Sequence, residues 1–353
     1  MADPQDKEAP GFTVSVNGTP LPLEASVLVN EVRVEEDATL PGMFTVALAG
    51  GSEDDETSWI DGDLFTVGGT VEIKMGYGDA LEKLMVGEIT GLEPSFTRGA
   101  PPMLVVRGYD RRHRLLRGKK TRSFLQQKDS DIASTIASEA GLTADAADSQ
   151  VTHEYVLQAN QTDMEFLQER ARLIRYEMTV DDKTLLFRPV QNDQGEVLTV
   201  TPQDDLLEFH PRLSTMGQLT ELKVRGWSPK DKKEVVGQAA QGDEVSTMGG
   251  QDSGAALANT AFGAAPVLVS STPVLAQAEA DQLAKAGFNR AALELIAGDG
   301  VCSGRTDLRP GTVIKLDGLG ARFSGQYYVK STSHCYTPRS AYQTSFVVWR
   351  NAS

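Results

Sequence analysis

The chain has little of several residue types on which common protein functions depend. Its 353 residues include two cysteines, Cys302 and Cys335, and four histidines. Two cysteines do not make a disulfide framework, and the scattered histidines lack the spacing of a metal site. No apolar run approaches the roughly 20 residues that a membrane-spanning helix needs. We therefore expect a protein with no cofactor, no metal and no stable membrane insertion.

Signals of catalysis are also missing. The sequence contains no Gly-x-Ser-x-Gly, His-Glu-x-x-His or phosphate-loop pattern. The adjacent pair His334 and Cys335 does not suggest a cysteine hydrolase, because neighbouring side chains in a strand point to opposite faces. Gly318, Gly320 and Gly325 do not have dinucleotide-binding spacing and are better explained as turn glycines. The sequence therefore predicts no enzymatic activity and no catalytic residues.

Positive charge is scarce. The chain has 34 Lys and Arg residues against 49 Asp and Glu residues, which gives a formal net charge of −15. Such a surface repels phosphate, so nucleic-acid binding is not expected as the main role. The first residues, Met-Ala-Asp-Pro-Gln-Asp-Lys-Glu, are polar and acidic, unlike a signal peptide. We expect the protein to be made and to fold in the cytoplasm.

The sequence does contain a pattern that occurs twice. A strand start of the form Gly-Thr-Val occurs at Val71 and again at Val313, and both regions end on an apolar strand that closes with arginine. Val71 and Val105 are 34 positions apart, as are Val313 and Val347. One interpretation is a β module carried twice, with unequal loops. The other interpretation is chance, since glycines at turns and alternating Val, Ile and Thr residues occur in any antiparallel sheet.

Apolar periodicity divides the chain into β-rich and helical parts. Helix patterns begin after residue 122 and include a possible capping box at Thr162 and Glu165. A stretch rich in Gly, Ala, Gln and Ser has few large apolar residues and predicts a long mobile loop. The predicted fold class is mainly β with an α+β insert. The predicted parts are a flexible lead at 1–10, a first antiparallel β module with a basic connector at 11–122, the insert at 123–205, and a second β module at 206–353 with the loop at 237–271 and a helix at 273–289.

One segment stands out chemically, because it places eight basic residues within positions 107–122 of an acidic chain. Three interpretations are open: a nucleic-acid patch, a connector that pairs with carboxylates of a neighbouring subunit or module, and a solvated basic loop. The global charge favours the connector. The candidate inter-subunit or inter-module contact residues are Arg107, Arg111, Arg112, Arg114, Arg117, Lys119, Lys120 and Arg122.

Four motifs in combination resemble the phage late control D family. They are Val-Arg-Gly-Tyr-Asp-Arg at 106–111 with the basic tract after it, Asn-Gln-Thr-Asp-Met-Glu-Phe-Leu at 160–167, Gly-Trp-Ser-Pro-Lys at 226–230, and Phe-Ser-Gly-Gln-Tyr-Tyr-Val at 323–329. The resemblance covers most of residues 10–351. Proteins of this family are baseplate hubs of contractile phage tails and extracellular contractile injection systems, similar to the N-terminal part of type VI spike proteins.

The resemblance implies a non-enzymatic structural hub. Family members look like homotrimers in which each chain supplies two tail-tube-like β-barrels, so that a threefold assembly matches a hexameric inner tube. The implied partners are the inner tube protein, a spike protein and baseplate wedge proteins, assembled in the bacterial cytoplasm into a phage tail or injection particle. The chain ends at Ser353 without a needle or lysozyme domain, so we expect the spike to be a separate polypeptide. The lumen of the ring is expected to be acidic.

Two alternatives belong to other classes. A tail-associated cell-wall hydrolase would need an acid pair or a nucleophile with its base, and the sequence offers neither. A glycan-binding adhesin would need exposed aromatic platforms, whereas the chain has three tryptophans and no Trp/Tyr-rich loop.

Overall fold

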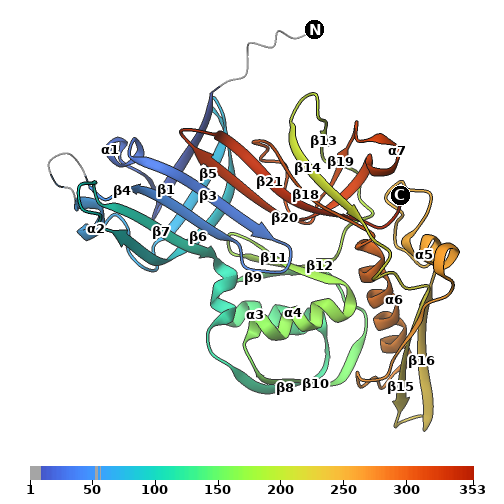
Figure 1. Cartoon of the computed structure of the whole chain (residues 1–353). Coiled ribbons are helices and arrows are strands. Elements are labelled where there is room, and N and C mark those ends of the chain that lie inside the picture. The colour runs from blue at the N-terminus through green and yellow to red at the C-terminus, as the bar shows by residue number, and fades with distance from the viewer. Residues whose placement is uncertain (1–8, 52–54, 56) are drawn as a thin grey trace.

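The computed structural model describes residues 9–51, 55 and 57–353, which form a large curved sheet with two smaller α+β bodies beside it (Figure 1). The predicted fold class is confirmed, since strands dominate and most ladders are antiparallel. Of the predicted lead at 1–10, residues 1–8 lie outside the described residues, and the first strand already begins at Pro10.

The first half of the large sheet is the first module. Its apolar residues alternate with polar ones, so one face of each strand is buried, as in the pattern of β7. The buried side chains of this face form a core that includes Val32, Phe44 and Val106. Its elements are β1 (Pro10–Val16), β2 (Thr19–Pro20), α1 (Leu23–Ser26), β3 (Val29–Asp37), β4 (Met43–Ala49), α2 (Ser58–Asp61), β5 (Thr70–Tyr77), β6 (Ala80–Ser95) and β7 (Met103–Asp110).

The second half of the sheet is the second module, which surrounds its own core around Tyr327, Phe346 and Val348. Its elements are β13 (Thr199–Val200), β14 (Leu206–Leu213), β18 (Ile296–Ser303), β19 (Val313–Leu316), α7 (Gly320–Phe323), β20 (Gly325–Thr337) and β21 (Ala341–Arg350). The two modules are parts of one sheet, because β3 pairs antiparallel with β20. Among the described residues, ladder pairing closes neither predicted barrel on itself.

The two modules have the same strand order. In the first module the neighbours are β5-β6-β7-β4-β3, and in the second they are β19-β20-β21-β18-β14. Two β-bulges recur at matching places in this order. One lies in β6 between Ile89 and Gly91 and in β20 between Val329 and Ser331. The other lies in β3 at Asn30 and in β14 at Leu207. Because a bulge is a specific local feature, its recurrence supports a true repeat.

The register of this repeat differs from the one that the equal spans indicate. Beyond the bulge in β6, the first paired residue of β7 is Arg107, opposite Gly91. Beyond the bulge in β20, the first paired residue of β21 is Val347, opposite Ser331. Arg107, and not Val105, is therefore the counterpart of Val347. The equal 34-position spans arise because a shorter loop and a shifted register compensate each other.

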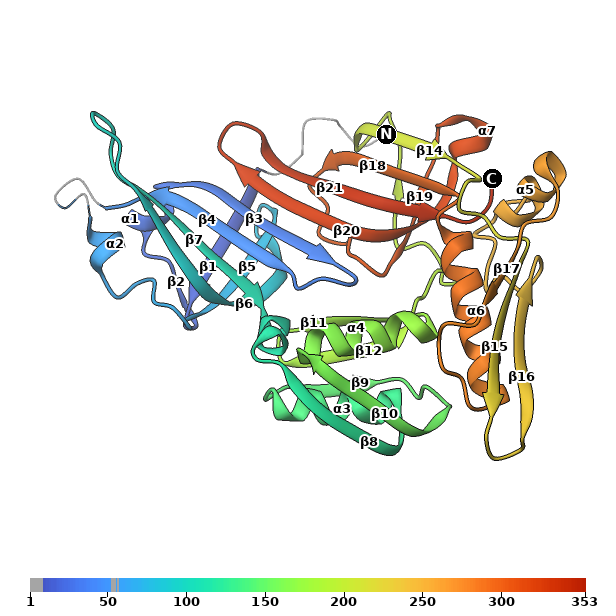
Figure 2. The same cartoon turned by 60° about the horizontal axis from the view of Figure 1, so that its bottom comes forward.

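The α+β insert lies against the sheet through the 3-10 helix that follows β7 (Figures 1 and 2). Its own core includes Phe124, Ile132, Phe166 and Phe187. The predicted capping box of its second helix is present. Its elements are η1 (Arg111–Leu116), β8 (Lys120–Lys128), α3 (Asp129–Glu139), β9 (Thr143–Ala146), β10 (Thr152–Gln161), α4 (Asp163–Ile174), β11 (Tyr176–Asp181) and β12 (Thr184–Pro189).

The predicted loop at 237–271 is wrong, because this stretch belongs to a second α+β body inserted between β14 and β18. Its small residues allow close packing: a Cβ added at Gly237 would lie 2.0 Å from the carbonyl oxygen of Ala280. Ala280 and Ala284 are fully buried in that contact. The elements are β15 (Glu221–Ser228), β16 (Lys233–Ala240), α5 (Gly254–Phe262), β17 (Pro266–Val269) and α6 (Gln277–Leu293).

The predicted helix at 273–289 begins and ends later, as α6. Val274 is buried against β15, and its carbonyl accepts a hydrogen bond of 3.1 Å from the backbone N–H of Trp227. This hydrogen bond keeps Val274 beside β15 and outside the helix, so the helix begins only after its N-cap residue, Ala276.

Candidate assembly site

The basic tract lies where the first module meets the insert. Arg111 and Arg112 are buried, which basic residues tolerate only when their charges are paired. Arg111 forms ion pairs with Glu88 of β6 and with Asp182 in the β11–β12 turn. Arg112 pairs with Asp110 at 2.7 Å and donates to the carbonyl oxygen of Met178 at 2.7 Å. These two side chains therefore join the insert to the sheet within one chain.

Glu88 is the acidic centre of this junction. His113 Nε2 lies 2.8 Å from one carboxylate oxygen, and the guanidinium of Arg114 donates to both oxygens. Burial by itself raises the pKa of Glu88, but the hydrogen bonds from Arg114 and His113 outweigh it and lower the pKa to about 2. The carboxylate is therefore ionised at any physiological pH, and its role is to fix the basic tract.

Further along, two basic residues hold the insert together internally. Arg122 pairs with Glu139 at 2.7 Å and with Asp163 at 3.0 Å, and its guanidinium lies 5.0 Å from the centre of the Phe124 ring. Lys120 pairs with the same two carboxylates, at 3.2 and 2.7 Å. Both residues belong to β8, inside the insert, and not to the connector before it.

The remaining three candidates are accessible. Arg107 pairs with Glu93 at 2.8 Å, and its side chain keeps 40% of its exposure. Arg117 and Lys119 are exposed in the turn between η1 and β8. Among the eight residues, Arg117 and Lys119 are thus the most exposed, whereas Arg107 resembles Lys120, whose paired side chain keeps 38% of its exposure.

The two modules are held together by a second junction. Arg309, in the loop between β18 and β19, donates to Glu36 of β3 at 2.6 Å and to the carbonyl oxygen of Leu84 at 2.7 Å. Burial raises the pKa of Glu36, and the nearby Arg309 opposes that rise. His334 of β20 is fully buried beside them, and burial together with the charge of Arg309 lowers its pKa to about 3. His334 is thus neutral, and Glu36 depends on Arg309 for compensation.

The histidines of the described part of the chain have partners within the chain. His153 lies against Asp129 in the interior of the insert. Its Nε2 is 3.2 Å from Asp129 and its Nδ1 is 3.4 Å from Glu279 of α6. Since both ring nitrogens face carboxylates, neither is free to accept a proton from a nucleophile. Within the described ranges, no cluster of three or more His, Cys, Asp or Glu residues is arranged to hold a metal ion.

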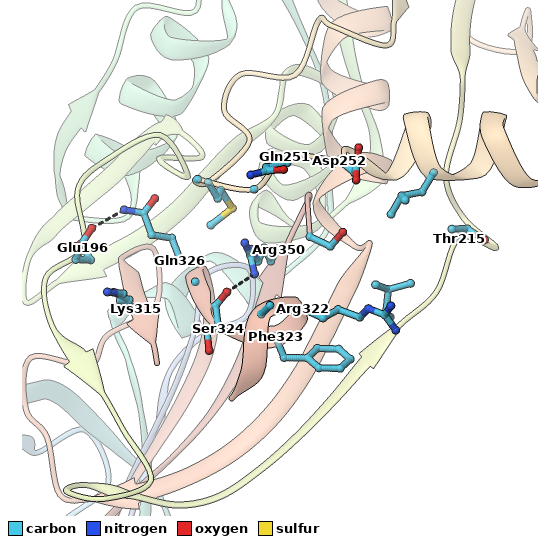
Figure 3. A pocket seen from close by; sticks show the side chains of 18 of the residues that line it. Glu196, Thr215, Gln251, Asp252, Lys315, Arg322, Phe323, Ser324, Gln326 and Arg350 are labelled. Carbon is cyan, nitrogen blue, oxygen red and sulfur yellow. Dashed lines mark hydrogen bonds between the residues drawn. The ribbon is translucent and has the colours of Figure 1, made fainter. Parts of the chain in front are cut away.

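A cavity of about 1220 Å³ opens beside α7, where it is bordered by the residues before α5 (Figure 3). Arg350 points into this region, where it donates to the carbonyl oxygen of Ser324 at 2.8 Å, and Gln326 donates to Glu196. Charges of both signs line it, and its lining includes no histidine or cysteine. The cavity therefore presents polar and charged groups without an imidazole or a thiol.

The family model for the Alg8 N-terminal domain matches residues 6–337, which is nearly the whole chain. The chain belongs to this family. No curated protein sequence matches it significantly. Among the described residues, no helix is both long and apolar enough to cross a membrane.

Solved structures of phage tail proteins share the fold. The 43 kDa tail protein of prophage MuSo2 from Shewanella oneidensis has a TM-score of 0.71 and 11% identity, covering 97% of this chain and 98% of that one. A tail protein from Neisseria meningitidis MC58 has a TM-score of 0.70 and 12% identity, covering 97% of each chain. An E. coli component of the type VI secretion system has a TM-score of 0.61 and 13% identity, covering 96% of this chain and 77% of that one. This chain thus has the fold of phage tail proteins.

Sequence reasoning missed the acidic partners of the junctions. Glu36 and Glu88 lie in strands in which the adjacent residues show an ordinary alternation of apolar and polar types. Their basic partners are distant in the sequence, so no local pattern links them. A signal was present for Glu36, because its position continues the buried row of Val32 and Val34. A carboxylate in a core row indicates a buried partner, although not which one.

Proposed function

We propose that this Alg8 N-terminal domain protein is a non-enzymatic baseplate hub. In this proposal it forms a homotrimer that adapts a hexameric inner tube to a trimeric spike, as the resemblance to the late control D family implies. Its partners are then the inner tube protein, a separate spike protein and baseplate wedge proteins, in a phage tail or injection particle assembled in the bacterial cytoplasm.

The recurrence of one strand order with two matching bulges carries this proposal. Two related modules per chain give six related units in a trimer, so each tube subunit can meet an equivalent surface while the assembly keeps threefold symmetry. The shared fold with tail proteins and a type VI component supports the same role. The second α+β body and the insert lie on one side of the sheet and are available to contact other baseplate proteins (Figure 2).

The face of the sheet opposite the two cores fits the wall of a channel. It runs without interruption across the module junction, where Glu35 lies opposite Ser333 and Asp37 opposite Ser331. On the strands β3, β7, β14 and β18 and on the part of β6 beyond its bulge, acidic residues outnumber arginines on this face, which supports the proposed acidic lumen; Lys74 of β5 and Lys315 of β19 lie on the same face. The acidic residues are Glu31, Glu35, Asp37, Glu93, Glu208 and Asp299, and the arginines are Arg33, Arg107 and Arg212.

Native mass spectrometry of the purified protein, alone and with its tube protein, tests the proposal. We expect a species of three chains, either alone or at the end of short tubes. A complex of six chains, or a monomer that binds tubes as such, would contradict it. Peptidoglycan zymography with the same sample is expected to show no clearing, and a cleared zone would favour the hydrolase alternative.

A further inference from the structure

The two strands that join the modules inside the chain each have an equivalent strand in the other module. These two equivalent strands each have one edge without a ladder partner among the described residues. Inside the chain, β3 of the first module pairs with the second half of β20. The counterpart of β3 is β14, and the counterpart of that half of β20 is the segment of β6 beyond its bulge.

Both counterparts lie at an edge of the sheet. β14 ends the strand order and pairs with β18, while its other side carries no ladder among the described residues. β6 pairs with β5 up to Glu88, and beyond the bulge it pairs with β7 on one side within the described residues. The two edges lie at opposite sides of the large sheet (Figure 2). An unpaired strand edge is a ready template for another chain.

We propose that β14 of one copy lies antiparallel beside residues 90–96 of the next copy, repeating the β3–β20 contact between subunits. This inference rests on the proposed trimer and names its interface. Since the contact joins different surfaces head to tail, it generates a ring when the rotation closes. The contact between modules then occurs six times around a trimer, three times within chains and three times between them.

The register follows from the internal contact. Ser333 lies opposite Glu35, and their counterparts are Glu93 and Arg212. The proposed interface therefore sets a carboxylate against a guanidinium. Arg212 is exposed, and Glu93 keeps 56% of its side-chain exposure although it already pairs with Arg107 of its own chain, so Arg212 would join an existing ion pair at the edge. Leu92 falls opposite Leu213 in the same register, and Phe96, which is 65% exposed, falls opposite Phe209.

One pair at the interface limits its hydrogen bonding. The bond from Ala38 N to Lys330 O identifies Val34 and His334 as a hydrogen-bonded pair. Their counterparts are Pro211 and Pro94, and neither has an N–H to donate. The proposed contact thus depends on its flanking apolar and charged pairs. Prolines at both edges also restrain each edge from indiscriminate pairing with other strands.

A disulfide between the edges tests the proposal. Glu93 and Arg212 occupy a non-hydrogen-bonded position, where Cα atoms of facing residues lie about 4.5 Å apart, within the reach of a disulfide. The variant Glu93→Cys/Arg212→Cys is made with Cys335→Ser, since Cys302 is buried. After oxidation, non-reducing gels are expected to show dimers and trimers and no larger species. Each single-cysteine variant is the control and should stay monomeric on the gel.

The outcomes separate this proposal from the proposed function. Native trimers without cross-links in the double variant would overturn the interface and leave the trimeric hub intact. A ladder extending past three chains would overturn ring closure. Absence of trimers in the unmodified protein, alone and with tubes, would overturn the proposed function itself.

Charge reversal supplies a second measurement that does not require oxidation. Arg212→Glu places two carboxylates opposite each other and is expected to weaken trimerisation several-fold, since exposed pairs contribute roughly 0.2–1 kcal/mol each. Because Glu93 also pairs with Arg107, the rescue exchanges both members of that pair: adding Glu93→Arg/Arg107→Glu keeps the ion pair within the chain and should recover part of the loss. The matched control is Lys230→Glu, an exposed reversal in the β15–β16 turn, which should leave assembly unchanged. Equal effects of Arg212→Glu and Lys230→Glu would contradict the interface.

Discussion

Replacing Arg309 by methionine should loosen the junction between the two modules. The change keeps most of the side-chain length but removes the donor to Glu36 at 2.6 Å and to the carbonyl oxygen of Leu84 at 2.7 Å. Glu36 keeps only 16% of its side-chain exposure, so water cannot readily replace the lost partner. Arg309→Met therefore leaves a largely buried carboxylate without its ion-pair partner.

The expected loss can be bounded. Breaking a fully buried ion pair by removing one partner costs about 3–5 kcal/mol. The side chain of Arg309 is 31% exposed, so screening by solvent reduces that figure, and we expect a loss of about 2–3 kcal/mol in the free energy of unfolding. The variant Glu36→Gln/Arg309→Met should regain part of it, because the glutamine carries no charge to be compensated.

The stability loss caused by Arg309→Met should depend on pH, and the direction follows from the pKa of Glu36. Burial raises the pKa of Glu36 above its unfolded value, and removing Arg309 should raise it further. A raised carboxyl pKa penalises the folded state at high pH, and the penalty fades as the pH falls through the folded pKa. The difference between wild type and Arg309→Met should therefore be largest near pH 8 and shrink toward pH 4. Urea denaturation at several pH values measures this, and a loss below about 0.5 kcal/mol at pH 8 would refute the reasoning.

Three further outcomes are expected. Burial lowers the pKa of His153, but the hydrogen bonds to its carboxylates, including Glu279, outweigh this and raise it to about 9. The stabilisation from the charged ring is complete below pH 6.5 and is lost as the pH rises through about 9. The protection factors of the α6 amides, which are corrected for the intrinsic rise of exchange with pH, should therefore fall above pH 9, and unchanged protection factors would contradict the assignment. Gly108→Ala sets a Cβ 2.3 Å from the ring of Phe44 and should lower the unfolding free energy by about 3 kcal/mol; an unchanged urea midpoint would show that the strands can move apart. Arg117→Ala, at an exposed turn, should change stability by less than about 0.5 kcal/mol, and a larger loss would reveal a contact within the chain.

The sequence predicted the class of the fold and the existence of two related β modules, because alternation and glycine punctuation are visible in it. The correct alignment of the modules was not visible. It depends on bulges at Thr90 and Lys330, and neither residue type marks a bulge. The equal spacing of Val71–Val105 and Val313–Val347 therefore indicates an alignment of the two modules that differs from the observed one.

The second α+β body was missed for a different reason. A scarcity of large apolar residues predicts a loop without a core. In the structure, Gly237 lets β16 approach the backbone of α6, and buried alanines complete the contact. Small residues let a helix and a strand approach closely, so the two backbones bury surface against each other without large side chains. Amino-acid composition alone does not distinguish such a contact from a loop.

The basic tract shows the limit of charge counting. An acidic chain with one basic segment indicates pairing with carboxylates, and Arg111 and Arg112 do pair with them. Whether a partner belongs to the same chain depends on which segments the fold brings together. Asp182 lies far along the chain from Arg111, in a turn whose position no local pattern reveals.

The most direct test of the central claim is the copy number and symmetry of this protein at the end of a tube. Cryo-electron microscopy of assembled particles, reconstructed without imposed symmetry, measures both. We predict three chains in a ring, with the two modules of each chain alternating at six related positions beneath the sixfold tube. A ring of six chains, or a single chain at the end of the tube, would contradict the account.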